Sequence, residues 1–397
     1  MSILVLNAGS STLKFALFDH AANTELVGGI VDWCGGDSTA TLHFRTSERE
    51  DCHTILECSD YRVAVNEILH SLSANDFNER ISIVGHRIVH GGPVFNQPTL
   101  IDDHMREELE QISTLAPLHN PPALTTVAAA RTAIPNAAHI AVFDTAFYSG
   151  LPMHEVVYPV PYQWLEEYGI RRYGFHGISH AYCAARAAEI LGRQEDLSLR
   201  LVICHLGNGC SATAVRGGQP IATTMGFTPL EGLMMGTRSG SIDPGILLHL
   251  MQQHGMNGEH LDESLNRRSG LLGISGVSSD FREVEQSANA GHKRASLAIE
   301  MFASRIRSTI GAFTVTLGGI DALIFTAGIG EHSTTLRSRV CNGLQCLNLL
   351  LDEDKNREND TDSDIAQMDS AVRILLIRTR EEQSIARAAQ RIRPGSP

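Results

Sequence analysis

The chain has 397 residues, of which 43% are hydrophobic and 19% charged, so its composition is that of a soluble globular protein and its length predicts two domains. A formal net charge of −13, without a concentrated stripe of lysine and arginine, argues against a nucleic-acid-binding protein. Eight scattered cysteines without a CxxC pair predict reduced thiols in a cytoplasmic protein. The first residues lack signal-peptide character and no apolar run is long enough to span a bilayer, so we expect no membrane association.

The first patterned stretch is a hairpin, in which strands at residues 2–8 and 13–19 flank a Gly-Ser-Ser-Thr turn. The hydroxyls of Ser10 and Thr12, together with Lys14, could surround phosphate oxygens. A polar hairpin tip is the simpler explanation of the turn taken alone. Asn7 at the strand end favours phosphate binding, because its amide oxygen suits a hard metal ion or its water shell.

Two more strands (24–32 and 40–46) and an amphipathic helix (61–72) precede a buried strand, ISIVGHRIVHGG, that starts at residue 81. Arg87 lies inside this strand and therefore needs an anionic partner. His119 precedes a Pro-Pro helix start, where it could bind an anion or serve only as a neighbour of the cap. The next buried strand, within residues 137–148, ends at Asp144. Ligands bind at such strand ends in open α/β sheets, and an aspartate of a cap or turn is the alternative.

We place the domain change in residues 150–161, after which the loop GFHG presents His176 before a helix that starts near residue 178. Phe175 could form the wall of a small pocket beside it. Residues 199–224 then repeat the strand–turn–strand plan of the N-terminal hairpin, with Gly207-Asn208-Gly209 in the turn. The two halves therefore share an internal plan, and two such units facing each other would clamp a polyphosphate from both sides.

The stretch MGFTPLEGLMMGTRSGSIDPG, residues 225–245, contains five glycines and only three charged residues. Arg238 lies between Gly236 and Gly240, a setting that suits delivery of its guanidinium to a carboxylate or phosphate in a confined space. A tight turn with a solvated arginine explains the stretch alone about equally well.

The remaining elements contain four further signals. A Ser-Asp helix cap at Asp280 precedes a long amphipathic helix from about residue 292 to 317, and a strand then leads into a Gly-Ile-Gly turn that admits a flat ring or a phosphate. Residues 351–369 are acidic and predict a solvated loop or hairpin. After a last strand at 371–379, Glu381 opens the final helix, where it could complement the helix dipole or reach a bound Mg²⁺.

Taken together, these motifs resemble the acetate kinases, which belong to a wider group with sugar kinases, Hsp70 chaperones and actin. The resemblance runs from residue 2 to the last helix, and its ten motifs stand in the family's order. They are LNAGSSTLKF, GHRIVHGG, APLHNPP, FDTAF, RRYGFHGISH, HLGNG, MGTRSG, SSDFRE, FTAGIGE and a closing T-x-E-E.

The resemblance implies an α/β fold of duplicated actin-like (ribonuclease H-like) domains, each a mixed β-sheet flanked by helices, with an interdomain cleft. One domain would comprise residues 1–149, joined by the C-terminal helix 383–397. The other, residues 150–382, would hold the nucleotide and the interface of a homodimer. The implied reaction is reversible transfer of the γ-phosphoryl group of ATP to acetate, giving acetyl phosphate and ADP.

The resemblance also implies roles for single residues. Arg87 and Arg238 would bind the acetate carboxylate and the transferring phosphoryl group, His176 would stabilise the charge on the phosphoryl oxygens, and Asp144 would orient this apparatus. Asn7 and Glu381 would hold Mg²⁺ or Mn²⁺. The substrate-binding residues would be Val89, Leu118, His119, Phe175 and Pro229. The nucleotide-binding residues would be Ser10, Thr12, Lys14, His205, Gly207, Asn208, Gly209, Asp280, Phe281, Arg282, Gly328, Ile329 and Gly330.

Elementary chemistry agrees with these roles, because acetate is already a nucleophile and the reaction needs positioning and charge stabilisation rather than a general base. The branched Val89 favours acetate over propionate. Three positions depart from the family pattern: His332 replaces an asparagine, Ser241 an aspartate, and Arg380 an asparagine or aspartate. The alternatives are a kinase for propionate or another short-chain acid, a nucleotide-dependent interaction protein like actin or Hsp70, and a relative that binds without catalysis.

Overall fold

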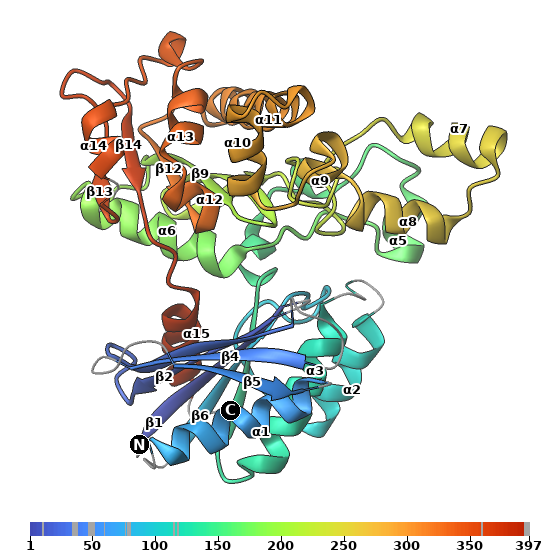
Figure 1. The fold of residues 1–397 in the computed structure, drawn as a ribbon, viewed down its shortest axis with the longest axis vertical. Helices are drawn as coiled ribbons and strands as arrows, with labels where there is room; N and C mark the ends of the chain where they lie inside the picture. Colours follow the sequence, from blue (N-terminus) through green and yellow to red (C-terminus); the bar gives the residue numbers. More distant parts are fainter. Residues whose placement is uncertain are drawn as a thin grey trace. The chain divides into compact units, whose positions relative to one another are not determined.

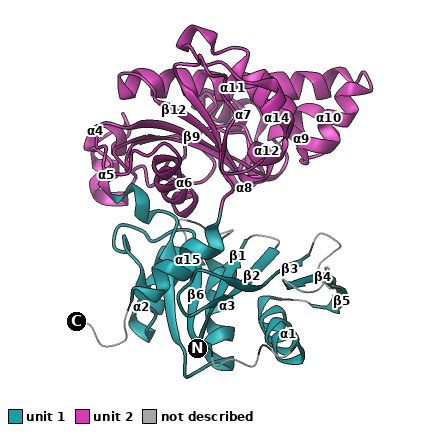
Figure 2. Cartoon of the chain, turned by 90° about the vertical axis from the view of Figure 1, so that its left-hand side faces the viewer, with its two compact units in different colours: residues 1–149, 380–397 teal, residues 150–379 magenta. Residues whose placement is uncertain are grey.

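The computed structural model describes residues 1–9, 12–33, 39–46, 52–58, 60–75, 77, 81–113, 116, 119–358 and 360–392. The chain separates into two compact units (Figure 2). Unit 1 comprises Met1–Ser149 and Arg380–Pro397, and unit 2 comprises Gly150–Thr379. Each unit is built around one mixed β-sheet.

The sheet of unit 1 has eight strands in the order β5-β4-β3-β2-β1-β6-β8-β7 (Figure 1). Strands β1 to β5 pair antiparallel in succession, whereas β6 and β8 run parallel to β1. Their bounds are β1 Ser2–Ala8, β2 Thr12–Asp19, β3 Glu25–Asp32, β4 Thr39–Thr46, β5 Cys52–Glu57, β6 Ile81–Ile88, β7 Thr99–Leu100 and β8 Ala138–Phe143. The strands expected in this half are confirmed, and β5 and the two-residue β7 are additional strands that the sequence pattern did not predict.

Helices cover both faces of this sheet. On one face α1 (Tyr61–Ala74) and α3 (Asn120–Ala133) pack on the sheet, with α2 (Asp103–Ile112) against α3. Leu4 and Leu6 of β1 lie in the core on this side. On the other face α15 (Glu381–Gln390) approaches β6 so closely that a Cβ on Gly85 would lie 2.8 Å from Ile385 Cγ2. Because side chains alternate along a strand, Asn7 and Arg87 lie on the α15 face.

The sheet of unit 2 has the order β11-β10-β9-β12-β14-β13. Strands β9 (Arg200–Leu206), β10 (Cys210–Arg216) and β11 (Gln219–Thr223) pair antiparallel, while β12 (Ala322–Thr326) and β14 (Arg373–Leu376) run parallel to β9. The short β13 (Ser363–Asp364) closes the edge. The series β3-β2-β1-β6-β8 of unit 1 has the same directions, which confirms the internal duplication.

Helices α6 (Gly177–Ile190) and α11 (Lys293–Leu317) cover opposite faces of this second sheet (Figures 1 and 2). The other helices of unit 2 are α4 Met153–Val156, α5 Gln163–Tyr168, α7 Pro244–His254, α8 Gly258–Arg267, α9 Gly270–Ser275, α10 Phe281–Asn289, α12 Ala327–His332, α13 Thr334–Cys341 and α14 Glu353–Glu358.

Among the described residues no helix is long and apolar enough to cross a membrane. All six cysteines with described side chains are free thiols, and only Cys346 is exposed.

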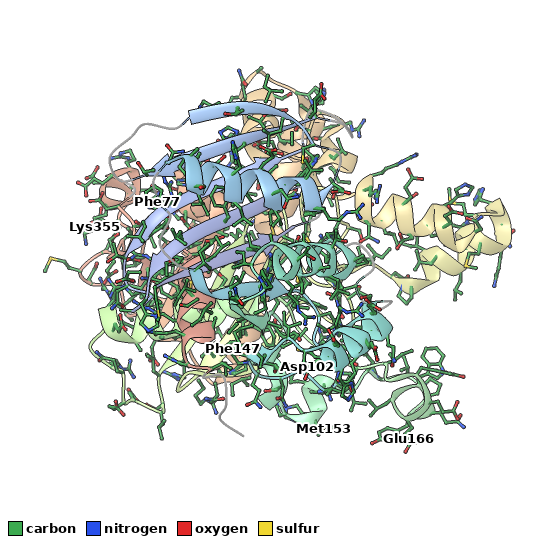
Figure 3. The ribbon with its side chains drawn as sticks, turned by 90° about the horizontal axis from the view of Figure 1, so that it is seen from below. Phe77, Asp102, Phe147, Met153, Glu166 and Lys355 are labelled. Carbon is green, nitrogen blue, oxygen red and sulfur yellow. The ribbon has the colours of Figure 1, made fainter. Side chains whose placement is uncertain are left out.

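Two local expectations were wrong. The acidic segment 351–369 is neither a solvated loop nor a simple hairpin, because it folds into α14 and β13, and Lys355 of α14 (Figure 3) donates from Nζ to the Ala366 carbonyl at 2.9 Å. Asn356 of α14 is fully buried and accepts a 2.7 Å hydrogen bond from Nε of the buried Arg337. The Gly-Ile-Gly sequence is not a turn before a helix but lies inside α12, whose first residue, Ala327, has a φ of 63°.

The buried His90, which follows β6, makes the stability of unit 1 depend on pH. Its Nδ1 accepts a 2.8 Å hydrogen bond from the backbone N–H of Gly92, and burial lowers its pKa from 6.5 to about 4. As the pH falls, His90 is therefore protonated in the unfolded chain before it is protonated in the folded protein. The stabilisation of the folded state by neutral His90 is complete above about pH 6.5 and declines as the pH falls towards 4.

We expect His90 to account for a loss of about 2 kcal/mol of unfolding free energy at pH 5 relative to neutral pH. The His90→Asn variant keeps an acceptor for Gly92 but does not titrate, so it should lose that much less over the same interval. Urea unfolding of both proteins at both pH values measures this difference in loss. The other buried histidines contribute equally in the two proteins, so their contribution cancels in the comparison. Equal losses in the two proteins would show that His90 is not responsible.

Candidate functional site

Three parallel neighbours in unit 1, β1, β6 and β8, each bring a polar side chain to their carboxyl ends. Asn7 lies near the end of β1, Arg87 near the end of β6, and Asp144 directly after β8. Arg87 donates from Nη2 to Asp144 Oδ2 at 2.6 Å and from Nε to Asp144 Oδ1 at 3.1 Å. Its Nη1 donates to Asn7 Oδ1 at 3.1 Å. Asp144 is thus the anionic partner that the position of Arg87 in a buried strand required.

This ion pair is largely removed from water, since the Arg87 side chain is 15% exposed and the Asp144 side chain 2%. Burial alone would lower the pKa of Arg87, but the charges of Asp144 and then Glu381 outweigh it and raise the pKa. The guanidinium is therefore permanently charged and held in a fixed orientation by a two-point contact.

The first turn of α15 adds two carboxylates beside Asn7. The amide Nδ2 of Asn7 donates to Glu382 Oε1 at 3.0 Å and to Glu381 Oε2 at 3.4 Å. These are oxygen donors of the kind that Mg²⁺ prefers. In the described part of the chain, no group of three or more His, Cys, Asp or Glu side chains could hold a metal by itself. An ion held here would take its remaining ligands from water or from a phosphate.

In unit 2, His176 sits at the N-cap of α6 in the left-handed region, with φ 59°. Its ring stacks on the ring of His205, with centroids 4.2 Å apart and an interplanar angle of 21°. Its Nδ1 lies 2.9 Å from the hydroxyl of Ser211. The same hydroxyl lies 2.8 Å from Nε2 of His180, and burial, followed by the charge of His205, lowers the pKa of His180 well below its usual value.

Arg238 approaches the same place from the glycine-rich stretch. A Cβ built on Gly209 would lie 3.3 Å from His176 Nε2 and 3.7 Å from Arg238 Nη1, so both side chains converge on this glycine. Arg238 donates from Nη1 to the Pro229 carbonyl at 3.3 Å, and burial lowers its pKa. The guanidinium is thus delivered into a confined space, as the glycine pattern suggested, rather than solvated on a turn.

The backbone around Arg238 is packed too closely for side chains. Gly236 donates its N–H to the Asn208 carbonyl at 3.0 Å, and a Cβ there would lie 2.1 Å from Asn208 Oδ1. Gly240 has a φ of 69°, and its Cβ would lie 2.5 Å from two carbonyl oxygens, those of Gly232 and Leu233. Ser241 then closes the loop, since its hydroxyl accepts from the Gly232 N–H at 3.0 Å.

The Gly240→Ala variant is expected to destabilise unit 2 by at least about 3 kcal/mol, because it combines a left-handed conformation with a clash against fixed backbone. Gly255 provides a matched control, since it has a φ of 63° and a Cβ there would meet nothing within 4 Å. The Gly255→Ala variant should cost only about 1 kcal/mol. Denaturant unfolding compares the two, and similar losses would contradict the close packing around Arg238.

A cavity of about 570 Å³ lies in unit 2, at the start of α10 and α12 and at the β9–β10 turn. Its size suits a nucleotide-sized ligand. The α10 cap beside it is formed by Asp280, which accepts from the Arg282 N–H at 2.8 Å and pairs with the Arg282 guanidinium at 2.5 Å. The lining residues are Gly207, Asn208, Ser279, Asp280, Phe281, Arg282, Glu285, Gly328, Ile329, His332 and Ser333.

The residues predicted from the sequence fall into both units. Unit 1 contains Asn7, Thr12, Lys14, Arg87, Val89, His119, Asp144 and Glu381, of which Asn7, Arg87, Asp144 and Glu381 form one contact cluster and His119 is the N-cap of α3. Unit 2 contains Phe175, His176, His205, Pro229, Arg238 and the predicted nucleotide residues from Gly207 to Gly330. Ser10 and Leu118 lie outside the described residues.

Several residues of these clusters were not assigned from the sequence. Glu382 contacts Asn7 more closely than Glu381 does, and the neighbouring pair of glutamates was the available signal. Ser279, Glu285 and Ser333 line the cavity. Ser211 is the second residue after the Gly-Asn-Gly turn, but no pattern in the sequence shows that it touches two histidines.

Comparison with known proteins places the chain among close relatives. A model of the acetokinase family matches residues 2–387. An acetate kinase from Cyanothece sp. is 47% identical over 398 residues, which covers 97% of each protein. A solved propionate kinase from Francisella tularensis superposes with a TM-score of 0.91 at 38% identity, covering 98% of this chain and 99% of that one. The acetate kinase of Porphyromonas gingivalis gives 0.88 at 38% identity and 98% coverage of both chains. The expected duplicated actin-like fold is thereby confirmed.

Proposed function

Since the chain belongs to the acetokinase family, we propose that it is an acetate kinase, which reversibly transfers the γ-phosphoryl group of ATP to acetate and gives acetyl phosphate and ADP. The observation that carries the proposal is the convergence of His176 and Arg238 on Gly209. A neutral or cationic donor beside a guanidinium suits a phosphoryl group whose charge spreads during transfer.

The reaction is a direct displacement. A carboxylate oxygen of acetate forms a bond to the γ-phosphorus, while the bond from that phosphorus to the bridging oxygen breaks and its electron pair leaves with ADP. No general base is needed, because acetate is already ionised. Arg87, oriented by Asp144, and Arg238 neutralise the two anions that must meet, and His176 donates a hydrogen bond to an oxygen of the transferring group.

ATP would occupy the cavity of unit 2, with its phosphates towards the β9–β10 turn at Asn208 and Gly209. The family resemblance assigns further phosphate contacts to Ser10, Thr12 and Lys14. Glu381 and Asn7 would hold Mg²⁺ or Mn²⁺, and Glu382, which is also in contact with Asn7, belongs to the same oxygen-rich group. When bound, the ion supplies positive charge next to the phosphates.

A hydroxamate assay tests the activity directly, because hydroxylamine traps an acyl phosphate. We expect hydroxamate only when acetate, ATP and a divalent metal are all present. Nucleotide binding without acyl phosphate would instead support an interaction protein of the actin and Hsp70 kind. A phosphorylated protein carboxylate that forms and decays as fast as turnover would contradict direct transfer.

The acid that this enzyme prefers is a separate question, since the solved propionate kinase superposes on the whole chain. Val89, which is 3% exposed and follows β6, fills space in the proposed acyl pocket. We expect the wild-type protein to prefer acetate. The Val89→Ala variant should raise kcat/KM for propionate relative to acetate by about 10-fold, which is the discrimination that one methylene group typically provides. An unchanged ratio of the two kcat/KM values would show that Val89 does not line the acyl pocket.

We further infer a cytoplasmic homodimer joined through unit 2. Helix α7 supports the dimer, because it has no buried residue and exposes Ile246, Leu248 and Met251, which are 47%, 58% and 48% exposed. Light scattering on the purified protein should give twice the mass of the chain.

A further inference from the structure

The hydroxyl of Ser211 lies between two imidazole rings in unit 2. Its Oγ is 2.9 Å from Nδ1 of His176 and 2.8 Å from Nε2 of His180, and the residue is fully buried on β10. A hydroxyl has one proton to donate, so it cannot donate to both rings. It could accept from both rings only if its own proton had a third acceptor, and among the described residues its hydrogen-bond contacts are to these two rings. One ring therefore donates to Ser211 and the other accepts from it.

Two arrangements satisfy both contacts with neutral rings. In the first, His180 donates from Nε2 to Ser211, Ser211 donates to Nδ1 of His176, and the proton of His176 is on Nε2. In the second, every proton is reversed, and Nε2 of His176 is an acceptor. The choice decides what His176 offers at Gly209, because Nε2 is the nitrogen that faces this glycine.

The neighbouring ring shows how a hydroxyl fixes this choice. Thr379 donates from Oγ1 to Ser179 Oγ at 3.1 Å, which leaves the proton of Ser179 for Nδ1 of His205 at 2.8 Å. If Ser179 donates this proton to Nδ1, a neutral His205 has its own proton on Nε2. His176 stacks on His205, and its Nδ1 also contacts a serine hydroxyl. Each of the two stacked rings is therefore held by a serine at Nδ1.

The surroundings of His176 also disfavour a second proton on its ring. Three titratable or charged groups of unit 2 that face it are His180 of its own helix, His205 of β9 and the guanidinium of Arg238. Burial, and then the charge of His205, lowers the pKa of His180 well below its usual range, so His180 is neutral. A cationic His176 would gain no anion from these three groups and would face a fixed positive charge at Arg238.

We propose that Ser211, backed by His180, is a positioning residue that holds His176 as a neutral imidazole with its proton on Nε2. The inference deepens the proposed function and rests on it for its catalytic meaning. His176 then acts as a neutral hydrogen-bond donor to the transferring phosphoryl group, and its proton stays in place throughout the reaction. Arg87 and Arg238 supply positive charge, and His176 supplies a hydrogen bond of fixed orientation.

The tautomer can be measured without turnover. Histidine-selective ¹⁵N labelling and long-range ¹H–¹⁵N correlation spectra distinguish a protonated from an unprotonated ring nitrogen, and a His176→Gln variant assigns the signal. We expect Nε2 protonated and Nδ1 unprotonated from about pH 6 to 8. A proton on Nδ1, or a ring that becomes cationic in this range, would overturn the proposal.

Kinetics give the second readout. The Ser211→Ala variant removes the donor to Nδ1, so we expect both tautomers in the spectrum, kcat lowered about 10- to 100-fold and KM for acetate and ATP nearly unchanged. The kcat of this variant should also become pH-dependent near neutrality, because the neutral ring has lost its support. Ser211→Thr keeps the hydroxyl and should restore both the tautomer and the flat pH profile.

Thr213→Val is the matched control, because it removes a buried hydroxyl two residues further along the same strand. It should leave the His176 signal and kcat unchanged. An unchanged tautomer in Ser211→Ala, or an equal loss of kcat in Thr213→Val, would contradict the positioning role. If the wild-type protein has the expected tautomer but forms no acyl phosphate, the proposed function fails while the assignment of the proton stands.

Discussion

Replacing Arg238 with alanine is expected to lower kcat for acetyl phosphate formation by about 10³-fold, with much smaller changes in KM for acetate and ATP. The guanidinium is partly buried and converges with His176 on Gly209, so it is positioned beside the group that we assign to phosphoryl transfer. Steady-state kinetics measure both constants. Arg238→Lys should recover only a small part of the loss, because an ammonium keeps the charge but not the planar fork.

The matched control is Arg268→Ala, which removes an arginine of the same unit that is 69% exposed and pairs with Glu263 at 2.6 Å. We expect its kinetic constants to equal those of the wild type. A loss in Arg238→Ala confined to KM would assign Arg238 to substrate binding only, since an interaction made in the transition state must appear in kcat.

The Arg87→Met variant should lose activity and also about 3 to 5 kcal/mol of unfolding free energy, because it leaves the carboxylate of Asp144 buried without its cation. Asp144 is 2% exposed at its side chain and receives hydrogen bonds from Arg87 at both oxygens. Urea unfolding and the hydroxamate assay measure the two effects in one preparation.

A double variant separates stability from catalysis. Arg87→Met with Asp144→Leu replaces the whole ion pair by apolar groups, so it should be more stable than the single variant and still inactive. Arg131→Ala is the control, because its partner Asp103 is 81% exposed and the pair should contribute at most about 1 kcal/mol. A double variant as unstable as Arg87→Met would show that the buried pair is not what the single change breaks.

The sequence predicted the parts of this molecule that follow from local chemistry. An arginine inside a buried strand, an aspartate at a strand end and a glycine-flanked arginine each signal their surroundings, and Arg87, Asp144 and Arg238 were found in this way. Ser211 could not be found, because its role depends on the register of β10 against β9 and on the first turn of α6, which are long-range features.

The two wrong expectations have the same origin. Segment 351–369 is rich in charged side chains, but its order comes from Asn356, which bonds to the buried Arg337 from another helix. The Gly-Ile-Gly sequence is helical because Glu331, a residue of the same helix, accepts hydrogen bonds from the N–H groups of Ala327 and Thr379, both at 2.9 Å. Composition and local propensity do not encode such distant partners.

Equivalent positions of the two duplicated sheets carry side chains of different chemistry. One step back from the last pair of each hairpin, Asn7 stands opposite Lys14 in unit 1 and His205 stands opposite Ser211 in unit 2. On the parallel side, Arg87 follows the partner of Leu6, and Thr326 is the partner of His205. Equivalent positions of one ancestral frame thus carry two cations and an amide in one half, and two hydroxyls and an imidazole in the other. At these sheet positions unit 1 supplies fixed charge, whereas unit 2 supplies hydroxyls and an imidazole and brings its guanidinium, Arg238, from a loop.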